Sequence, residues 1–243
     1  MSEKLWYLKR CDLFLQLSED AIRQVEMRSR ARKFPRNSPI YLPADDDDVV
    51  YLLASGRAKI CHLTNEGKQS ILAFIEPGEI FGELSVIQES PRDEYAEAVE
   101  ACTIVQIPGD VIRDLMEQNV GVSLGITKLI GLRRQRIERR LKNLLFLSNR
   151  QRLTHLLLEL MEQYGAAAQD GVQLTIKLSH QELSSIIGST RESVTVVLGE
   201  LQLEGLIKVG RRRITIRDPT ALAKSVQREA PELPSTRSVS ATK

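Results

Sequence analysis

The spacing of apolar positions divides the chain into three parts. Residues 5 to 30 place apolar side chains at helical spacing, and Ser18 before two acids is a typical helix cap. From Phe34 to Pro108, short runs rich in Val, Ile, Leu, Phe and Tyr are broken by Gly or Pro about every 8 to 15 residues. This pattern predicts an antiparallel sandwich or barrel. The acidic run from Asp45 to Asp48, between two predicted strands, is interpreted as a solvated loop.

A long helical pattern follows, from Val111 to about Leu147. Its apolar seam has the heptad spacing of a coiled coil, and it is formed by Thr127, Ile130, Ile137, Leu141 and Leu144. The seam predicts a helix that pairs with its copy in a homodimer. Arg134 also stands in the seam, where a charge is costly unless it is paired.

The third part predicts two helices and a hairpin. Ser179 and Glu182 form a capping-box pattern at the first helix, and Gly188 ends that helix. The same pattern, from Ser189 through Thr190 to Glu192, starts the second helix. A helix pair joined by a short Gly-containing turn is a helix-turn-helix unit. The following hairpin is a wing whose tip carries Arg211, Arg212 and Arg213.

The second helix of this unit carries polar side chains that fit base reading. Its predicted outward face consists of Arg191, Glu192, Thr195, Val196 and Gly199. An Arg can grip guanine through O6 and N7, and a Glu can accept from cytosine N4. The alternative is an ordinary surface helix with Glu192 as a cap, and Glu192 can also serve both roles.

At these residues the sequence resembles the cyclic-AMP receptor protein and fumarate–nitrate regulator (Crp–Fnr) family. "FGEL…PR", "EACTIVQIP", the long helix and "GSTRESVTVVLGELQLEGLI" occur in the family's order, from about Leu8 to Asp218. The resemblance implies an α+β fold. It begins with a jelly-roll effector domain at residues 1–110 and a dimerisation helix at residues 111–147. A winged helix-turn-helix domain at residues 148–220 and a tail at residues 221–243, expected to be disordered, follow. Its implied partners are a palindromic double-stranded DNA site, a second copy and RNA polymerase. Val196 stands where the family often has a third base-reading Arg, so the preferred site should differ at one base pair per half-site.

The resemblance also locates an effector pocket. The family's phosphate-binding pattern matches Gly82, Glu83, Leu84 and Arg92, and the long helix contributes Arg134, Ile137 and Glu138. Both halves of the pocket depart from the pattern of the cyclic-AMP-binding members. Asp93 and Glu94 replace a Ser or Thr and an Ala, and Ile137 and Glu138 stand where those members present small hydroxyl residues to the adenine. Each carboxylate close to a phosphate costs about 1 kcal/mol in water and more when shielded. Cyclic AMP is therefore disfavoured as the effector.

Three interpretations of the pocket remain open. In the first it binds no small molecule, and Arg92, Asp93 and Glu94 pair with each other and with Arg134 or Arg136. In the second it binds another ligand, such as a cyclic dinucleotide or a cationic or neutral metabolite. In the third a cysteine senses redox state. The cysteines, Cys11, Cys61 and Cys102, lack metal-site spacing and are expected to be buried thiols.

Charge and composition narrow the function further. The net charge is only +2, but nine basic residues against one acid lie between Lys128 and Arg152. Neither a membrane span nor a secretory signal is recognisable, which predicts a cytoplasmic protein without a membrane partner. There is no P-loop, metal-ligand cluster or nucleophile–base motif to indicate an enzyme. The alternative to a transcription regulator is a cyclic-nucleotide-type sensor or scaffold that acts through protein partners.

Overall fold

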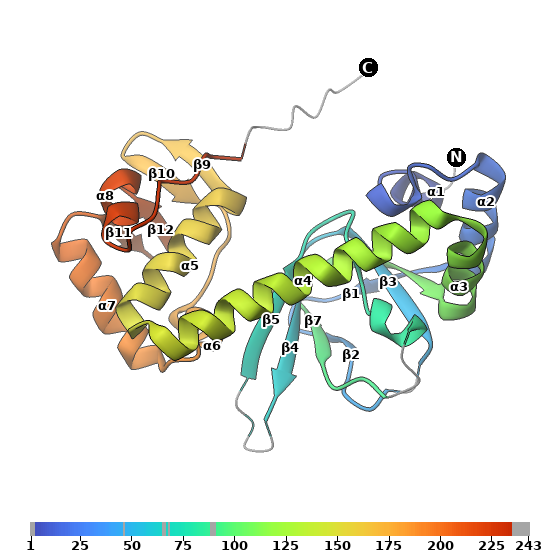
Figure 1. The fold of residues 1–243 in the computed structure, drawn as a ribbon, viewed down its shortest axis with the longest axis horizontal. Coiled ribbons are helices and arrows are strands. Elements are labelled where there is room, and N and C mark those ends of the chain that lie inside the picture. Colours follow the sequence, from blue (N-terminus) through green and yellow to red (C-terminus); the bar gives the residue numbers. More distant parts are fainter. Residues whose placement is uncertain (1–2, 46, 65–66, 68, 88–90, 235–243) are drawn as a thin grey trace. The chain divides into compact units, whose positions relative to one another are not determined.

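The computed structural model describes residues 3–45, 47–64, 67, 69–87 and 91–234 of the 243-residue chain (Figure 1). The chain forms two compact units, Met1–Ile137 and Glu138–Lys243. Helices and antiparallel sheets occur in both, so the α+β class is confirmed. Within the described ranges, every helix is too short or too polar to cross a lipid bilayer.

The amino-terminal segment of the first unit forms separate short helices rather than one continuous helix. Its amino-terminal elements are α1 (Glu3–Leu8), η1 (Asp12–Phe14) and α2 (Glu19–Arg28). Ser18 caps α2 as predicted, since its hydroxyl accepts a hydrogen bond from the Ala21 amide at 3.2 Å. The chain leaves α1 after Leu8 and buries Leu8, Cys11 and Phe14 in one apolar cluster.

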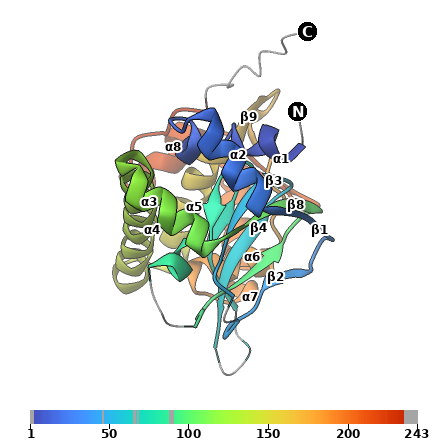
Figure 2. The same cartoon turned by 90° about the vertical axis from the view of Figure 1, so that its right-hand side faces the viewer.

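The jelly roll is formed by two four-stranded antiparallel sheets, ordered β1-β8-β3-β6 and β2-β7-β4-β5 among the described residues. The strands are β1 (Arg30–Phe34), β2 (Pro39–Tyr41), β3 (Val49–Ser55), β4 (Ala58–Leu63), β5 (Gln69–Ile75), β6 (Ile80–Phe81), β7 (Tyr95–Ala98) and β8 (Cys102–Pro108). Tyr51 and Ile104 from one sheet pack against Ile60 and Ile75 from the other. The outer face of the first sheet is covered by α2 and by α3 (Gly109–Gln118) (Figure 2).

The long helical segment is interrupted near its start. The pattern predicts one helix from Val111, but α3 ends at Gln118 and α4 (Val120–Phe146) begins two residues later. Asn119 between them has an extended backbone, with φ −134° and ψ 103°. The interruption lets both helices bury apolar side chains, including Ile112 on α3 and Ile126 on α4. Periodicity continues across the break and could not reveal it.

The second unit contains the helix-turn-helix and a four-stranded sheet ordered β11-β12-β10-β9. Its elements are α5 (Asn149–Tyr164), β9 (Gly165–Ala168), β10 (Gly171–Leu174), α6 (His180–Ile187), α7 (Arg191–Leu203), β11 (Ile207–Gly210), β12 (Arg213–Ile216) and α8 (Pro219–Lys224). The sequence predicts a loop where β9 and β10 form a hairpin. Strand β10 is held by pairing with β12, which is distant in sequence, and Val172 lies opposite Ile216. Strand β9 is rich in Ala, which has low strand propensity, so the local sequence does not indicate a strand there.

Part of the segment predicted to be a disordered tail is folded. Helix α8 continues to Lys224, beyond the predicted boundary at residue 220. Asp218 caps it by accepting a hydrogen bond from the Ala221 amide at 2.8 Å, and Leu222 is fully buried. The rest of the predicted tail from residue 235 lies outside the described residues.

Candidate functional site

The turn between α6 and α7 sets the start of the candidate DNA-reading helix. Gly188 ends α6 with a left-handed backbone, φ +63° and ψ 50°, which a glycine adopts readily. Helix α7 is capped by Thr190, whose hydroxyl accepts from the Ser193 amide at 3.2 Å. The predicted second capping box is therefore wrong by one residue, because Ser189 is not the cap. Glu192 is the second residue of the helix and takes no part in capping.

The outward face of α7 is as the sequence predicts. Arg191, Glu192, Thr195, Val196 and Gly199 are all exposed, whereas Val194, Leu198 and Leu201 are buried. The side chains of Arg191 and Glu192 form no hydrogen bond or ion pair with any residue that the structure describes. The Thr195 hydroxyl is already engaged, since it donates to the Arg191 carbonyl at 2.9 Å and lies 2.8 Å from His180 Nδ1.

The wing presents three exposed arginines beside this helix. Gly210 pairs with Arg213, so Arg211 and Arg212 form a two-residue turn. Arg212 has φ +53°, a left-handed conformation that is unfavourable for a residue with a side chain. Gln202 on α7 accepts from the Val209 amide on β11 at 2.9 Å and ties the wing to the helix.

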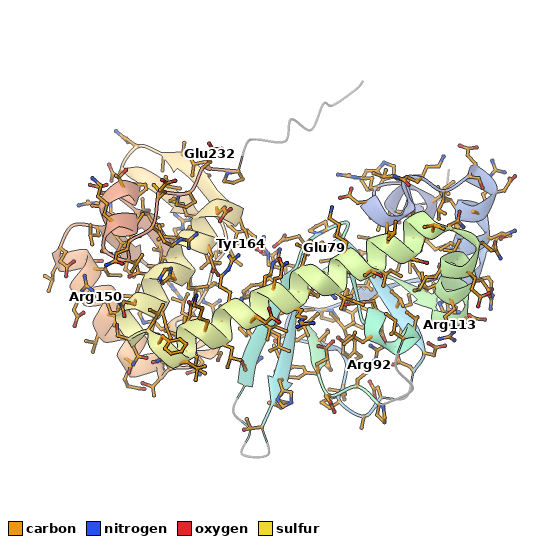
Figure 3. The ribbon with its side chains drawn as sticks, in the orientation of Figure 1. Glu79, Arg92, Arg113, Arg150, Tyr164 and Glu232 are labelled. Carbon is orange, nitrogen blue, oxygen red and sulfur yellow. The ribbon has the colours of Figure 1, made fainter. Side chains whose placement is uncertain are left out.

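Two arginines of the predicted basic stretch serve the fold instead. Arg152 on α5 donates to the carbonyls of Ile187 and Gly188, at 2.8 and 3.3 Å, and so holds the turn before α7. Arg150, labelled in Figure 3, pairs with Glu200 and Glu204 on α7. Both contacts are local to the second unit, and only the fold reveals them.

In the first unit, every side-chain nitrogen of Arg92, the residue labelled in Figure 3, donates a hydrogen bond. Its Nε donates to Asp47 Oδ1 at 3.3 Å, and its Nη1 donates to the Gly82 carbonyl at 3.3 Å. Its Nη2 donates to the carbonyls of Val49 and Asp47, at 2.6 and 3.2 Å. The guanidinium lies 4.5 Å from the Tyr41 ring centroid, and the side chain is only 6% exposed.

Aromatic rings surround this guanidinium. Tyr51 stacks against both Tyr41 and Phe81 with centroids 5.3 Å apart, and the Tyr41 and Phe81 centroids are 6.2 Å apart. The Tyr51 hydroxyl donates to Asp47 at 2.6 Å, and burial raises the pKa of Tyr51. Gly82 has φ +71°, and a Cβ there would lie 2.9 Å from Arg92 Nη1 and from the Tyr51 ring, so the close packing requires glycine.

Glu94 faces this cluster as a half-buried acid. The Tyr41 hydroxyl donates to Glu94 at 2.8 Å. Burial raises the pKa of Glu94, and the charge of Glu83 raises it further, against the opposing effect of the Tyr41 hydrogen bond. Burial, followed by the nearby Glu94, likewise raises the pKa of Tyr41.

A second ion pair joins the pocket to the long helix. Arg133 on α4 pairs with Glu83, whose side chain is 4% exposed, and also donates to the Ile80 carbonyl at 2.5 Å. The predicted pairing of Arg92, Asp93 and Glu94 with each other and with Arg134 or Arg136 is wrong. Asp47 and Tyr41 are the partners of Arg92 and Glu94, and Arg133 is the arginine that enters the pocket.

The other predicted pocket residues are not drawn into this cluster. Asp93 is exposed and has no side-chain partner within the described part of the chain. Leu84 is half-exposed beside Glu83, and Arg134, Ile137 and Glu138 are exposed on α4. Ile137 and Glu138 stand at the junction of the two units, so their role remains a prediction.

Two family models match the chain. A cyclic nucleotide-binding domain matches residues 31–119, and a Crp-like helix-turn-helix domain matches residues 151–225. The chain is 30% identical over 192 residues to the Global nitrogen regulator of Synechocystis sp., over 78% of this chain and 85% of that relative. This chain belongs to the Crp–Fnr family of DNA-binding transcription regulators. It is also 24% identical over 217 residues to the CRP-like cAMP-activated global transcriptional regulator of Mycobacterium tuberculosis, over 89% of this chain and 97% of that relative.

Solved structures have the same fold. A Crp–Fnr transcriptional regulator of Thermus thermophilus is 26% identical, with a TM-score of 0.66 over 82% of this chain and all of that chain. A CooA mutant from Carboxydothermus hydrogenoformans is 23% identical, with a TM-score of 0.73 over 84% of this chain and 90% of that chain. The predicted jelly roll and helix-turn-helix of this Crp–Fnr regulator are thus confirmed.

The Arg92 guanidinium is largely engaged by this chain's own acceptors. A guanidinium has five N–H donors, and Arg92 uses four of them on its own chain. One N–H at most remains for a phosphate. Asp47, Glu83 and Glu94 add carboxylates around it, which oppose a second anion.

The three cysteines take no part in this pocket's ion pairs. Among the described residues, no three His, Cys, Asp or Glu side chains lie where they could hold a metal ion. Cys11, Cys61 and Cys102 are all buried, as predicted. Burial raises the pKa of Cys11 to about 11, so its reactive thiolate is scarce at neutral pH.

Proposed function

We propose that this chain is a homodimeric, sequence-specific transcription regulator that binds a palindromic DNA site without needing cyclic AMP. The carrying observation is that Arg191 and Glu192 stand exposed at the start of α7 with no side-chain partner in the described part of the chain. Charged groups held free at a helix start, beside a basic wing, are what major-groove reading requires. The rival function, a sensor or scaffold acting through protein partners, needs neither feature.

The chemistry of α7 assigns a role to each exposed residue. Arg191 grips guanine, and Glu192, which is not occupied by capping, accepts from cytosine. Val196 contacts a thymine methyl, and the backbone amides after Ser189 and Thr190 face a phosphate at the helix start. The wing arginines, Arg211, Arg212 and Arg213, bind the phosphate backbone without sequence preference.

Dimerisation is assigned to α4. Ile137, Leu141 and Leu144 are 48%, 54% and 48% exposed, although their spacing forms one apolar strip. Pairing with the same strip of a second copy removes this surface from water, which favours a coiled-coil homodimer. Thr127 and Arg134 occupy exposed positions of the same seam.

Effector independence is supported by the pocket rather than by the relatives' names. Related regulators are named for cyclic AMP or for nitrogen, so the names do not agree on one effector. In this chain the carboxylate of Asp47 already neutralises Arg92. The alternative is that the pocket binds a cyclic dinucleotide or a cationic or neutral metabolite. Measuring DNA affinity with a compound of each of these classes added tests this alternative.

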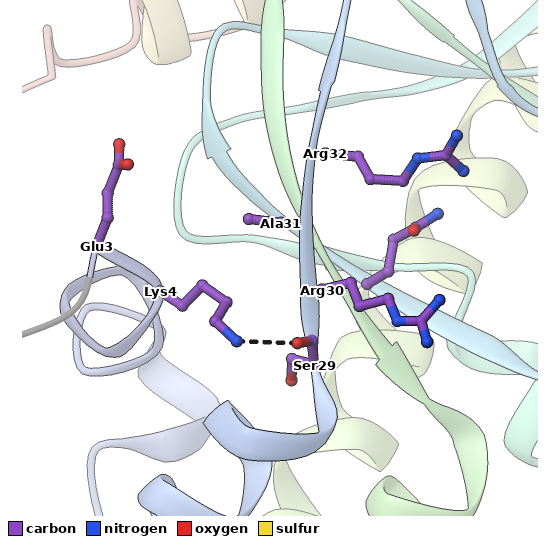
Figure 4. A pocket seen from close by; sticks show the side chains of 7 residues that line it. Glu3, Lys4, Ser29, Arg30, Ala31 and Arg32 are labelled. Carbon is purple, nitrogen blue, oxygen red and sulfur yellow. Dashed lines mark hydrogen bonds between the residues drawn. The ribbon is translucent and has the colours of Figure 1, made fainter.

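RNA polymerase is the proposed protein partner, in the cytoplasm. Strand β1 is the edge of its sheet, and an open groove of about 890 Å³ runs beside it, lined by Glu3, Lys4, Ser29, Arg30, Ala31, Arg32 and Gln106 (Figure 4). Among the described residues Arg30 has no hydrogen-bond or ion-pair partner, and the Arg32 guanidinium lies 5.9 Å from the Phe34 ring centroid. A basic sheet edge fits an extended acidic segment. Arg30→Glu is expected to reduce transcription in a purified system and leave DNA affinity unchanged.

Fluorescence anisotropy on a labelled palindromic duplex, with a scrambled duplex of equal length, tests the main proposal. We expect specific binding that weakens steeply with salt, because wing and helix arginines displace counterions. A plot of binding stoichiometry should give two chains per duplex. Equal affinity for the palindromic and scrambled duplexes, or no binding to either, would refute the proposal and favour the scaffold function.

A further inference from the structure

We infer that Asp47 is the specificity-determining residue of the effector domain: its carboxylate is a built-in anion that occupies Arg92 and excludes phosphate-bearing ligands. The inference rests on the proposed function, since it names the cause of effector independence. Asp47 belongs to the acidic run that the sequence interprets as a solvated loop. In the structure it is paired with Arg92 at 3.3 Å, on the guanidinium that a phosphate would use.

The contact is anchored from several directions. Arg92 bonds both the side chain and the backbone carbonyl of Asp47, and the Tyr51 hydroxyl donates to the same carboxylate. The Ala44 amide donates to the Arg92 carbonyl at 2.9 Å, which links the segment before Asp47 to the backbone of Arg92. Asp47 is therefore held against Arg92 by its loop, its neighbour Tyr51 and the ion pair itself.

Asp47 explains the site better than the two carboxylates next to Arg92 in sequence. Asp93 is exposed, and Glu94 is occupied by the Tyr41 hydroxyl. Neither neutralises the Arg92 guanidinium through a hydrogen bond. Replacing Asp47 by Asn keeps an acceptor for Tyr51 and removes the charge, so Arg92 is left as a buried cation that needs an anion.

The test compares Asp47→Asn with Asp48→Asn in the full chain. Asp48 is the next residue, and it pairs with the half-exposed Arg113 outside the pocket, so its substitution removes the same charge but leaves the Asp47 counter-ion on Arg92. The melting temperature of each protein is measured in chloride and in inorganic phosphate at equal ionic strength, and then with cyclic AMP. Neither probe involves DNA, so failure here is distinguishable from failure of the proposed function.

We expect phosphate or cyclic AMP to raise the melting temperature of Asp47→Asn by about 3 °C or more, because an anion that binds only the folded state stabilises it. Wild type and Asp48→Asn should shift by less than about 1 °C. An equal shift in all three proteins, or none in Asp47→Asn, overturns the inference.

A second variant covers the case in which Asp47→Asn does not fold. The double variant Asp47→Asn/Arg92→Gln removes the cation that Asp47 is inferred to neutralise. Recovery of folding in the double variant supports the counter-ion role, because the cost then came from an unpaired Arg92. Failure to recover overturns it, since Asp47 would be needed for something other than Arg92.

Discussion

The two ends of this regulator treat their arginines in opposite ways. In the effector domain, the Arg92 side chain is almost fully buried and donates four hydrogen bonds to acceptors of its own chain. In the DNA-reading domain, Arg191 is exposed and its guanidinium has no partner among the described residues. Both residues are arginines at positions that a family pattern marks as ligand-binding. The difference is whether the chain itself supplies the acceptors.

An arginine at a family's ligand-binding position is therefore not always free to bind a ligand. A guanidinium that already bonds protein acceptors gains little from a ligand, because the ligand must replace those bonds. An exposed guanidinium exchanges only water for its target. The DNA-reading end therefore keeps its chemistry free for an external partner, while the effector end uses the same chemistry to hold its own fold together.

The largest expected effect is in the effector domain. Arg133→Gln leaves the buried Glu83 without its ion-pair partner, which costs about 3 kcal/mol or more of stability. The measurement is the free energy of unfolding in urea. Arg136→Gln is the control on the same helix, since Arg136 is exposed and unpartnered in the described structure. Equal destabilisation by the two variants would show that the Glu83 pair is not what holds this site.

The second effect is on DNA binding. Arg191→Ala should lower specific affinity by about 1–3 kcal/mol and relax one base position, because a bidentate contact to a base is lost. Arg212→Ala is the matched variant in the wing, and it should weaken all duplexes alike and reduce the salt slope by about 1. Anisotropy titrations on specific and scrambled duplexes measure both. A uniform loss from Arg191→Ala would remove its base-reading role.

The DNA-reading end was far more predictable from sequence than the pocket. Caps, Gly188 and the buried stripe of α7 are local signals within about 25 residues, and apart from a cap displaced from Ser189 to Thr190 they predicted the structure. The partners of Arg92 depend on contacts 43 and 45 residues away in sequence. No spacing rule connects such residues. The sequence pattern also places the start of the β region at Phe34, whereas strand β1 begins at Arg30. The first residues of β1 form an exposed edge without apolar alternation, so the pattern does not reveal them.

The displaced cap makes a prediction of its own. Thr190→Ala should destabilise the protein by about 1 kcal/mol, because the Ser193 amide loses its acceptor at the start of α7. Ser189→Ala should be nearly neutral, since the Ser189 hydroxyl caps nothing. Thermal unfolding of both variants is sufficient to compare them. The reverse order of effects would restore the cap that the sequence pattern predicts.

The smallest effect concerns Glu94. Its pKa is raised by burial above the ordinary 4.5, so the folded state holds the proton more tightly than the unfolded state. The resulting stability is present below pH 4.5 and is lost as the pH rises through the folded-state pKa. Glu94→Gln keeps the Tyr41 bond and avoids that loss, so it should raise the melting temperature at pH 7 but not at pH 4. Asp93→Asn, at an exposed neighbour, is the control for removing a carboxylate from this segment.

The central contrast is between an occupied effector site and a free DNA-reading surface. The most direct measurement is the dissociation constant of the purified wild-type protein for its palindromic duplex, with and without saturating cyclic AMP. We expect the two constants to agree within about twofold, because Asp47 already neutralises Arg92. A tightening of tenfold or more, about 1.4 kcal/mol, would show that cyclic AMP displaces Asp47 and would contradict this account.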